Sequence, residues 1–506
     1  MKVPNEDPSR QERPKDSLAV WFFRLFHLKR RDLPKLFKLW GLYVLLSCGT
    51  EVAKLVAEVL FVSRAGIRWL PSLFVFQALT NTLASVGYVA LVKKWKGSSV
   101  FVALLAGFGV VMVATSLGVE WTEGALTYAL LFGCAEAGAT LLKIHWGVHI
   151  LEIYDPKSAS RVFPFLFTGA ALGRSAGGAA VRGGAALLGL PLLLTLTIGC
   201  TVPLSLFLLW TRKRSPGGPG AASDPLSSKK RRKNNSLDPD ADDLFIKKPL
   251  PHPSGPGAKT KQAHEDLSPS GPDPYTKPPD DSAEELSTGA FFQRGAPRRI
   301  RKVLRALFSS KMIRAMMIST ALMVVLRHVM RYGSLVVLQR GFDEAALAGT
   351  LGTYAVVANL LGVGLQLLFT PRLLKRFGVE AANLLYAGSI TVGITSLALT
   401  GTVSSALLTR FFHSEFKGAV RTPISPIFYF GEPPHRRAEA RAFILGGVVP
   451  VFTVISGLLL QCVSDLVDVT TLAWAGTGLG VFYALACVWQ NKVYRKRIQN
   501  IETSRY

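Results

Sequence analysis

Twelve apolar stretches of roughly 20–27 residues dominate this 506-residue chain. An α-helix needs about 20 apolar residues to cross the hydrocarbon core of a bilayer, which is about 30 Å thick. Only 18% of the residues are charged, against about a quarter in ordinary soluble domains. We therefore expect an all-α membrane protein with twelve transmembrane helices, and a large soluble core is excluded. The expected spans are 39–63, 69–92, 99–118, 124–150, 162–187, 190–210, 313–339, 345–370, 381–401, 403–429, 441–463 and 470–489.

Basic residues lie mainly on one side of these spans. The leader 1–38 contains ten lysines and arginines, whereas the connecting segments 119–123, 401–403 and 464–469 contain none. Loops rich in lysine and arginine stay in the cytoplasm, so both termini are expected there. The same bias explains most of the formal net charge of +26, and no nucleic-acid partner is expected.

Three polar segments flank or interrupt the spans. Residues 18–28 of the leader place apolar side chains at helical spacing among basic ones, which predicts an interfacial helix on the membrane surface. The segment 211–311 contains 14 of the 29 prolines, and this composition predicts a disordered cytoplasmic linker. Its basic run 229–233 is either a solvated part of that loop or a contact for anionic lipid or nucleic acid. A cytoplasmic tail is expected over 491–506.

The linker separates two halves, 39–210 and 312–490, whose sequences resemble each other. Span two ends in Leu-Val-Lys-Lys-Trp-Lys-Gly at 91–97, and span eight ends in Leu-Leu-Lys-Arg-Phe-Gly at 373–378. Spans four and ten each contain a mid-span glutamate and are followed by a proline-containing turn with arginines. Two parallel six-helix pseudo-repeats joined by a long cytoplasmic loop are typical of transporters of the major facilitator type.

Charged residues within the membrane concentrate in spans one, four, seven and ten, which line the central cavity in that architecture. A charge near the middle of a span costs roughly 2.5–3.5 kcal/mol on insertion scales, so it needs a partner or a function. The basic residues are Lys54, Lys143, Arg327, Arg331, Arg410, Lys417 and Arg421, and the acidic residues are Glu51, Glu58, Glu136 and Glu415. The excess of positive charge predicts an anionic solute.

Arg327 and Arg331 are the strongest candidates for contact with such an anion. They lie one helical turn apart, and no acid within their own span offsets them. An anion in a water-filled cavity would do so, because the planar guanidinium group binds phosphate or carboxylate through two hydrogen bonds. For other residues simpler interpretations remain open: Lys54 pairs with a nearby glutamate, and Arg410 and Arg421 extend to the two membrane surfaces.

We accordingly predict two functional sets of residues. The substrate-binding set is Arg327, Arg331, Lys417, Lys54, Lys143 and Arg421. The coupling or gating set is Glu58, Glu136 and Glu415. His145 and His149 either titrate with a coupling proton or have a structural role. No nucleophile–base set, phosphate-binding loop or metal-ligand spacing is found, so no enzymatic activity, catalytic residue, metal or cofactor is expected.

Several short motifs follow one another in a recognisable order. Trp146 to Lys157 leads into Arg-Val-Phe-Pro at 161–164 and a small-residue run at 169–173. In span one, Lys54 to Phe61 precedes a glycine and a Leu-Pro pair, and span ten ends in Tyr-Phe-Gly-Glu-Pro-Pro at 429–434 before a basic helix. Taken in order, these motifs resemble the nucleotide (ATP/ADP) transporters of intracellular bacteria and plastids, and more closely their relatives in free-living bacteria.

This resemblance implies alternating-access exchange of a nucleotide, with Glu136 at the position of a glutamate in the family's fourth span. This sequence differs from the family's motifs at two places, and these differences limit which properties of the family can be expected here. Ala57 and Glu58 replace the family's span-one Lys-Asp pair, and Arg327 and Arg331 occupy the region of its span-seven glutamate. Anion transport therefore carries over better than ATP/ADP exchange itself.

The expected function is secondary transport of an anionic, phosphorylated solute such as a nucleotide across a bacterial inner membrane. Two alternatives remain: a proton-coupled transporter of another organic anion or drug, and a transport-inactive membrane scaffold whose linker binds partners. The lipid bilayer and the small anionic solute are the expected partners, and no obligate protein partner is evident.

Overall fold

The structure is a computed structural model that describes residues 33–503 except 96, 123, 154–155 and 215–307. The described chain is built from α-helices with short π- and 3-10-helical segments, and it contains no strand. The expected interfacial helix at 18–28, the basic run 229–233 and almost all of the expected linker lie outside the described residues. The helices before residue 211 and those after residue 296 belong to one compact unit.

Seven helices and two short η segments make up the first half. The bounds are α2 (Leu33–Leu60), η2 (Phe61–Ala65), η3 (Ile67–Trp69), α3 (Leu70–Lys94), α4 (Gly97–Trp121), α5 (Ala125–Ile153), α6 (Pro156–Leu188), α7 (Leu190–Leu193) and α8 (Leu196–Arg214). The expected sixth span is thus divided into α7 and α8. The interruption lies at residues 194–195. Gly189, whose positive φ of 76° is a conformation that glycine adopts without strain, separates α6 from α7.

The helices of the second half are interrupted more often, by four π- or 3-10-helical segments. The bounds are α11 (Lys311–Gly341), α12 (Glu344–Gly364), η5 (Leu365–Phe369), α13 (Thr370–Thr400), α14 (Val403–Phe411), η6 (Phe412–Arg421), α15 (Thr422–Phe428), η7 (Tyr429–Gly431), α16 (Pro434–Phe443), η8 (Ile444–Val448), α17 (Val449–Val463) and α18 (Val469–Thr503). The turn expected after span eight is instead a kink inside α13 at Gly378, where φ is 78°. The tenth expected span contains the ten-residue π-helix η6.

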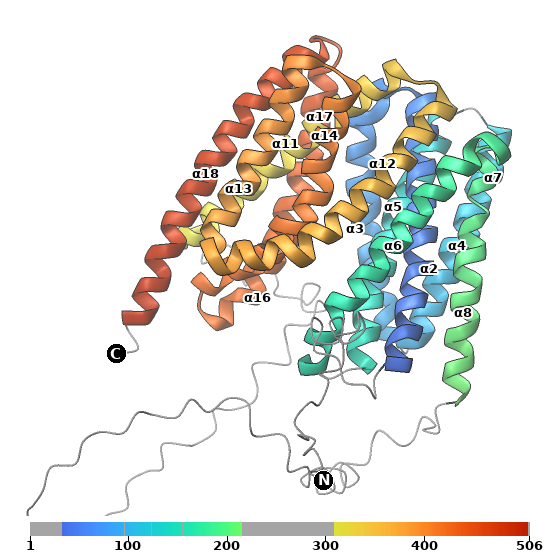
Figure 1. The fold of residues 1–506 in the computed structure, drawn as a ribbon, viewed down its shortest axis with the longest axis horizontal. Coiled ribbons are helices and arrows are strands. Elements are labelled where there is room, and N and C mark those ends of the chain that lie inside the picture. Colours follow the sequence, from blue (N-terminus) through green and yellow to red (C-terminus); the bar gives the residue numbers. More distant parts are fainter. Residues whose placement is uncertain (1–32, 96, 123, 154–155, 215–307, 504–506) are drawn as a thin grey trace, which may run out of the picture. The chain divides into compact units, whose positions relative to one another are not determined.

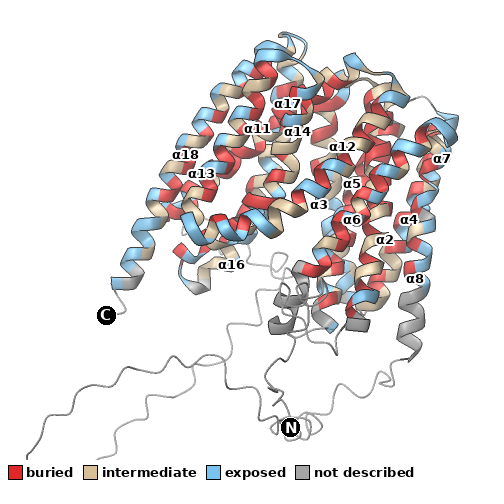
Figure 2. Cartoon of the chain, viewed as in Figure 1, coloured by how far each residue is buried: buried red, intermediate tan, exposed pale blue. Residues whose placement is uncertain are grey.

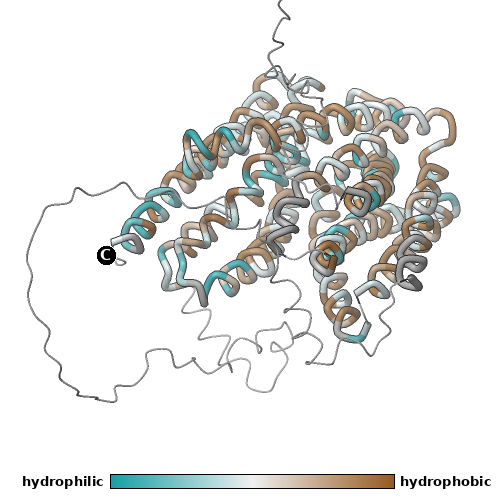
Figure 3. The backbone as a smooth tube through the Cα atoms, turned by 60° about the horizontal axis from the view of Figure 1, so that its bottom comes forward, coloured by the Kyte–Doolittle hydropathy of each residue, from teal (hydrophilic) through white to brown (hydrophobic). Residues whose placement is uncertain are grey.

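The outward surfaces of the helices are apolar enough for lipid. By length and composition, seven described helical segments qualify as membrane spans, the longest being Glu344–Thr400. Large apolar side chains such as Leu83, Val110 and Phe482 are more than half exposed, which suits contact with lipid tails rather than water. Hydrophobic residues run along most helices, while the end of α18 is hydrophilic (Figure 3). These observations describe an all-α membrane protein.

The two halves meet along α6 with α12 and along α3 with α17, and α6 and α12 lie side by side (Figure 1). A Cβ atom on Gly352 would come within 2.5 Å of the Gly178 carbonyl oxygen, and one on Gly457 within 2.7 Å of the Pro71 carbonyl oxygen. Only glycine permits such close backbone contact between helices. Red segments, which mark buried residues, recur along the helices of both halves (Figure 2).

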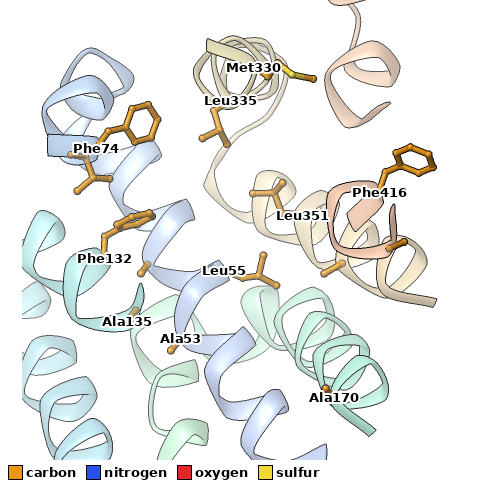
Figure 4. Packing of buried hydrophobic residues seen from close by; sticks show 14 of the residues in the cluster. Ala53, Leu55, Phe74, Phe132, Ala135, Ala170, Met330, Leu335, Leu351 and Phe416 are labelled. Atoms are coloured by element: carbon orange, nitrogen blue, oxygen red, sulfur yellow. The ribbon is translucent and has the colours of Figure 1, made fainter. Parts of the chain in front are cut away.

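Apolar side chains from both halves form one buried cluster near these contacts. Phe74, Phe132 and Leu55 come from the first half, and Leu335 and Leu351 from the second (Figure 4). All five are fully or almost fully buried. The contact between the halves is therefore closely packed at this level.

We name the two ends of the bundle after α2 and η2: the Leu33 end and the Ala65 end. Polar contacts between the halves gather at the Ala65 end. Both Nε and Nη2 of Arg64 donate to Glu344, each over 2.9 Å. The Gln339 amide donates to the Val62 carbonyl oxygen over 2.8 Å, and Ser72 Oγ donates to Gln461 Oε1 over 2.7 Å.

Polar contacts between the halves stop near the middle of the bundle. Arg174 of α6 donates to Asn359 of α12 over 2.5 Å. Among the described residues, this polar contact between the halves is the nearest to the Leu33 end. Gly173, beside it, packs against Val44 in the middle of α2. The halves are therefore joined by polar contacts at the Ala65 end and at mid-depth, and not at the Leu33 end of the described chain.

Candidate functional site

A carboxylate of the first half lies between two guanidinium groups of the second half inside the bundle, two residues before the end of α2. Glu58 of α2 accepts hydrogen bonds from Arg331 of α11, over 3.0 Å from Nη2 and 3.3 Å from Nε. It also accepts hydrogen bonds from both Nη atoms of Arg410 of α14. Only 5% of the Glu58 side-chain surface is exposed. We call Glu58, Arg331 and Arg410 the central triad.

A second ion pair lies beside the central triad in the first half. Lys54 of α2 and Glu136 of α5 are 3.4 Å apart, and the Glu136 carboxylate lies 4.0 Å from Arg331 Nη2. Arg331 also lies over the rings of Phe74 and Phe132, with its guanidinium carbon 5.7 and 5.1 Å from their centroids. Arg331 is thus held from several sides by residues of the first half.

This geometry corrects two expectations drawn from the sequence. Arg331 was expected to lack acidic compensation, but the acids come from the other half of the chain, which a search within its own span does not detect. Arg410 does not extend to a membrane surface, because it binds Glu58. The open possibility that Lys54 pairs with a glutamate agrees with its contact to Glu136.

Three other basic residues form a separate group in the second half, which we call the cationic set: Arg327, Lys417 and Arg421. Lys417 lies within electrostatic range of both arginines. Within the described part of the chain, none of the three forms an ion pair with an acid, and the side chains of Arg327 and Lys417 make no hydrogen bond. Arg327 and Lys417 are half-buried, so part of each side chain remains accessible.

Arg421 is the most constrained member of the cationic set. It is buried, donates to Asn383 Oδ1 over 2.6 Å and lies over the Phe428 ring. Asn383 in turn donates to Asn491 Oδ1 over 2.9 Å. The interpretation that Arg421 extends to a membrane surface is therefore wrong, because α13 and α18 enclose its side chain.

Position and helix type explain why these side chains meet. Arg327 and Arg331 are separated by one turn of the regular helix α11, so they share one face. Lys417 and Arg421 belong to η6, whose wider turn is characteristic of functional segments. His413, also in η6, is 6% exposed, and neither of its ring nitrogens has a hydrogen-bond partner among the described residues.

The remaining predicted residues lie toward the edges of this region. Lys143 of α5 is half-buried and within electrostatic range of Lys54 and Arg174. The Glu415 carboxylate lies 3.9 Å from Arg174 Nη2. Arg174 was missed in the sequence, where it is the single charge within a run of small residues, Gly-Arg-Ser-Ala-Gly at 173–177. That isolation is the signal that identifies it.

The histidines of α5 differ in their surroundings. His145 is buried, with one ring nitrogen 3.0 Å from the Tyr88 hydroxyl and the other 2.8 Å from the Gly97 carbonyl oxygen. Both nitrogens are thus satisfied, which favours the structural interpretation. The His149 ring lies beside that of Phe101 in a tilted orientation, with ring centroids 5.5 Å apart. Among the described residues, no group of three or more potential ligands is arranged to bind a metal.

A small groove lies apart from these charges, on the outer face between α3 and α17. Its volume is about 260 Å³, and Ser72, Phe76, Leu79, Leu458 and Gln461 contribute to its lining. Leu79 and Leu458 are each 55% exposed, so the groove opens to the lipid-facing surface. It is not part of the charged interior.

Comparisons with known proteins identify the fold. No family model and no curated protein matches the sequence. The structure is similar to the nucleoside transporter NupG, with a TM-score of 0.57 and 12% identity over 90% of this chain and 99% of that one. It is also similar to the inward-open xylose transporter XylE from E. coli (TM-score 0.53, 11% identity, 90% and 95% covered) and to the POT family transporter PepTSo (0.56, 10%, 93% and 99%). The chain therefore has the all-α fold of major facilitator-type membrane transporters.

Proposed function

We propose that this protein is a secondary transporter of an anionic, phosphorylated solute such as a nucleotide. The observation that carries the proposal is the cationic set: Arg327, Lys417 and Arg421 share one region of the interior without an acidic partner among the described residues. Uncompensated positive charges within a membrane span cost roughly 2.5–3.5 kcal/mol each on insertion scales. A bound anion offsets this cost, whereas a neutral solute does not.

The residue types favour phosphate over a single carboxylate. Two guanidinium groups and one ammonium group supply more donors than one carboxylate accepts, and phosphoryl groups are suited to such multiple contacts. In this proposal Arg327, Lys417 and Arg421 bind the phosphates. Lys54, Lys143 and Glu136 form the opposite wall in the first half, and Glu58, Arg331 and Arg410 connect the two halves.

The arrangement of contacts supports access from one side. The halves are joined at the Ala65 end by Arg64, Glu344 and Gln339. Among the described residues, no polar contact between them lies closer to the Leu33 end than that of Arg174. We propose that both termini are cytoplasmic and that the membrane is a bacterial inner membrane. The site then opens toward the cytoplasm, and rocking of the halves exposes it to the other side.

Uptake into proteoliposomes tests this function. Vesicles containing the purified protein should take up radiolabelled ADP, and more rapidly when they are preloaded with unlabelled nucleotide. Arg327→Ala and Lys417→Ala should each reduce uptake at least about tenfold, because each removes a charged hydrogen bond to the phosphate of the bound nucleotide. Arg495→Ala, which breaks an exposed contact with Glu380 at the end of α18, should leave uptake unchanged.

The same assay separates the alternatives. Uptake of an organic anion that depends on a pH gradient and is insensitive to nucleotide would identify a proton-coupled transporter. Folded protein that transports no tested anion under either condition would contradict the proposal and leave the scaffold interpretation.

A further inference from the structure

We propose that the Glu58 carboxylate is an internal competitor for the transported anion, and that the solute must displace it from Arg331 and Arg410 before the two halves can move. The inference rests on the proposed function, since it concerns the same interior. It adds a reason why the two halves would move less readily in the empty carrier than in the carrier with bound solute.

The first argument is the occupancy of the central triad. The two arginines present their donors to one point, and both oxygens of Glu58 accept hydrogen bonds there. This is the contact that a phosphoryl or carboxyl group of a solute would make. Glu58 comes from α2, whereas both arginines come from the other half of the chain. The carboxylate therefore occupies an anion site that the second half supplies.

The second argument is continuity between this site and the cationic set. Arg327 lies one turn of α11 from Arg331, and His413 lies within electrostatic range of Arg327, Arg331 and Arg410. From Arg421 through Lys417 and Arg327 to Arg331, each basic side chain thus lies within electrostatic range of the next. A solute with two or more phosphates, bound first at the cationic set, would have its next phosphate adjacent to Arg331 and would compete directly with Glu58.

The third argument is that a displaced Glu58 has another partner. Lys54 lies one turn earlier on the same face of α2 and within electrostatic range of Glu58. Lys54 already contacts Glu136. Its ammonium group has three hydrogen-bond donors and can therefore bind a second carboxylate as well. The glutamate can therefore leave the arginines without remaining an unpaired buried charge.

The consequence is a link between binding and movement. Both ion pairs of Glu58 cross between the halves, so they hold the empty carrier in the arrangement described here. When the solute takes the two arginines, those cross-links are lost and replaced by contacts to the solute. A ligand shifts a conformational balance only through such a difference in contacts between states. Movement of the empty carrier is then disfavoured, and exchange of one anion for another is the expected mode.

Binding of pyrophosphate to the purified full-length protein tests the competition. Glu58→Gln should tighten pyrophosphate binding about tenfold or more, because the competing charge is removed while the side chain keeps its size. Glu51→Gln is the matched control. It changes the net charge by the same amount on the same helix, two turns away, and Glu51 forms no ion pair or hydrogen bond with Arg331 or Arg410 in the described structure. This control should alter affinity less than about threefold.

Two further measurements keep the test decisive. If Glu58→Gln does not fold, Glu58→Asp retains the charge but withdraws it by one methylene group, and pyrophosphate binding should still tighten. In proteoliposomes, either variant should increase release of labelled ADP in the absence of external nucleotide relative to exchange. Unchanged or weaker pyrophosphate binding by folded variants would overturn the competition and leave the proposed function intact. Failure of the unmodified protein to bind pyrophosphate or ADP would overturn both.

Discussion

Arg327 and Arg331 have the same residue type and lie one turn apart, yet their surroundings differ. Arg331 binds Glu58 and lies against two aromatic rings, whereas Arg327 has no acidic or hydrogen-bonding partner in the described chain. Breaking a buried ion pair leaves the remaining charge uncompensated, which commonly costs about 3–5 kcal/mol. Arg327 lies within electrostatic range of Arg331, Lys417 and Glu136 but forms no ion pair among the described residues. Its removal therefore breaks no buried ion pair. The two arginines should therefore respond differently to substitution.

We expect Arg331→Ala to lower the melting temperature of the solute-free protein, because Glu58 then depends on Arg410 alone. Arg327→Ala should leave that melting temperature unchanged or raise it, since repulsion of Lys417 is relieved, while weakening ADP binding about ten- to a hundredfold. Differential scanning fluorimetry with and without ADP measures both effects. Equal destabilisation by the two substitutions would show that Arg327 is also structural, and would leave Lys417 and Arg421 as the anion-binding residues.

The sequence located the charged residues of the site but could not pair them. Unpaired mid-span charges are visible in a single chain because apolar runs make them stand out. The contact between Glu58 and Arg331 joins positions 273 residues apart, and it depends on which helix faces which after folding. The partner of Arg174 was unpredictable for the same reason, and the π-helical form of η6 left no sign in the residue pattern.

Among the helices, the crossing of α6 and α12 depends on two glycines in backbone contact. Gly178 and Gly352 each exclude a Cβ atom on the other. The two helices can pack this closely only in one relative position of the halves. A larger side chain at either glycine would force the halves apart at the Ala65 end. The twelve apolar runs of the sequence predict that helices cross. They do not predict which helices cross each other, or at what depth in the bundle. Element boundaries at Gly189 and Gly378 likewise depend on backbone conformation.

We expect Gly352→Leu to separate the halves at the Ala65 end. Spin labels at positions 68 and 345, in protein whose native cysteines are replaced, should move apart in double electron–electron resonance measurements. Gly349→Leu is the matched control, because it lies one turn away on α12 and a Cβ there meets nothing within 4 Å. An identical distance distribution in the Gly352 variant would mean that the crossing does not limit closure.

For the whole molecule, the alternation of basic and non-basic connections predicts the orientation in the membrane. Thr402 lies between α13 and α14, and Asn500 near the end of α18, at opposite ends of these helices. Single cysteines at the two positions should react with an impermeant reagent from opposite sides of intact vesicles, with position 500 on the cytoplasmic side. Labelling of both from one side would contradict the twelve-span topology.

The ion pair between Arg64 and Glu344 is sensitive to the salt concentration of the solution outside the bundle. Both side chains are partly exposed, at 38% and 31%, and an exposed pair contributes about 1 kcal/mol or less. Dissolved ions screen such a pair over a Debye length of about 8 Å at physiological ionic strength. Concentrated salt at the Ala65 end should therefore weaken the contact and shift the balance between the two access states by up to about fivefold. In the proposed transporter, the position of the two halves would then respond to the ionic strength on that side of the membrane.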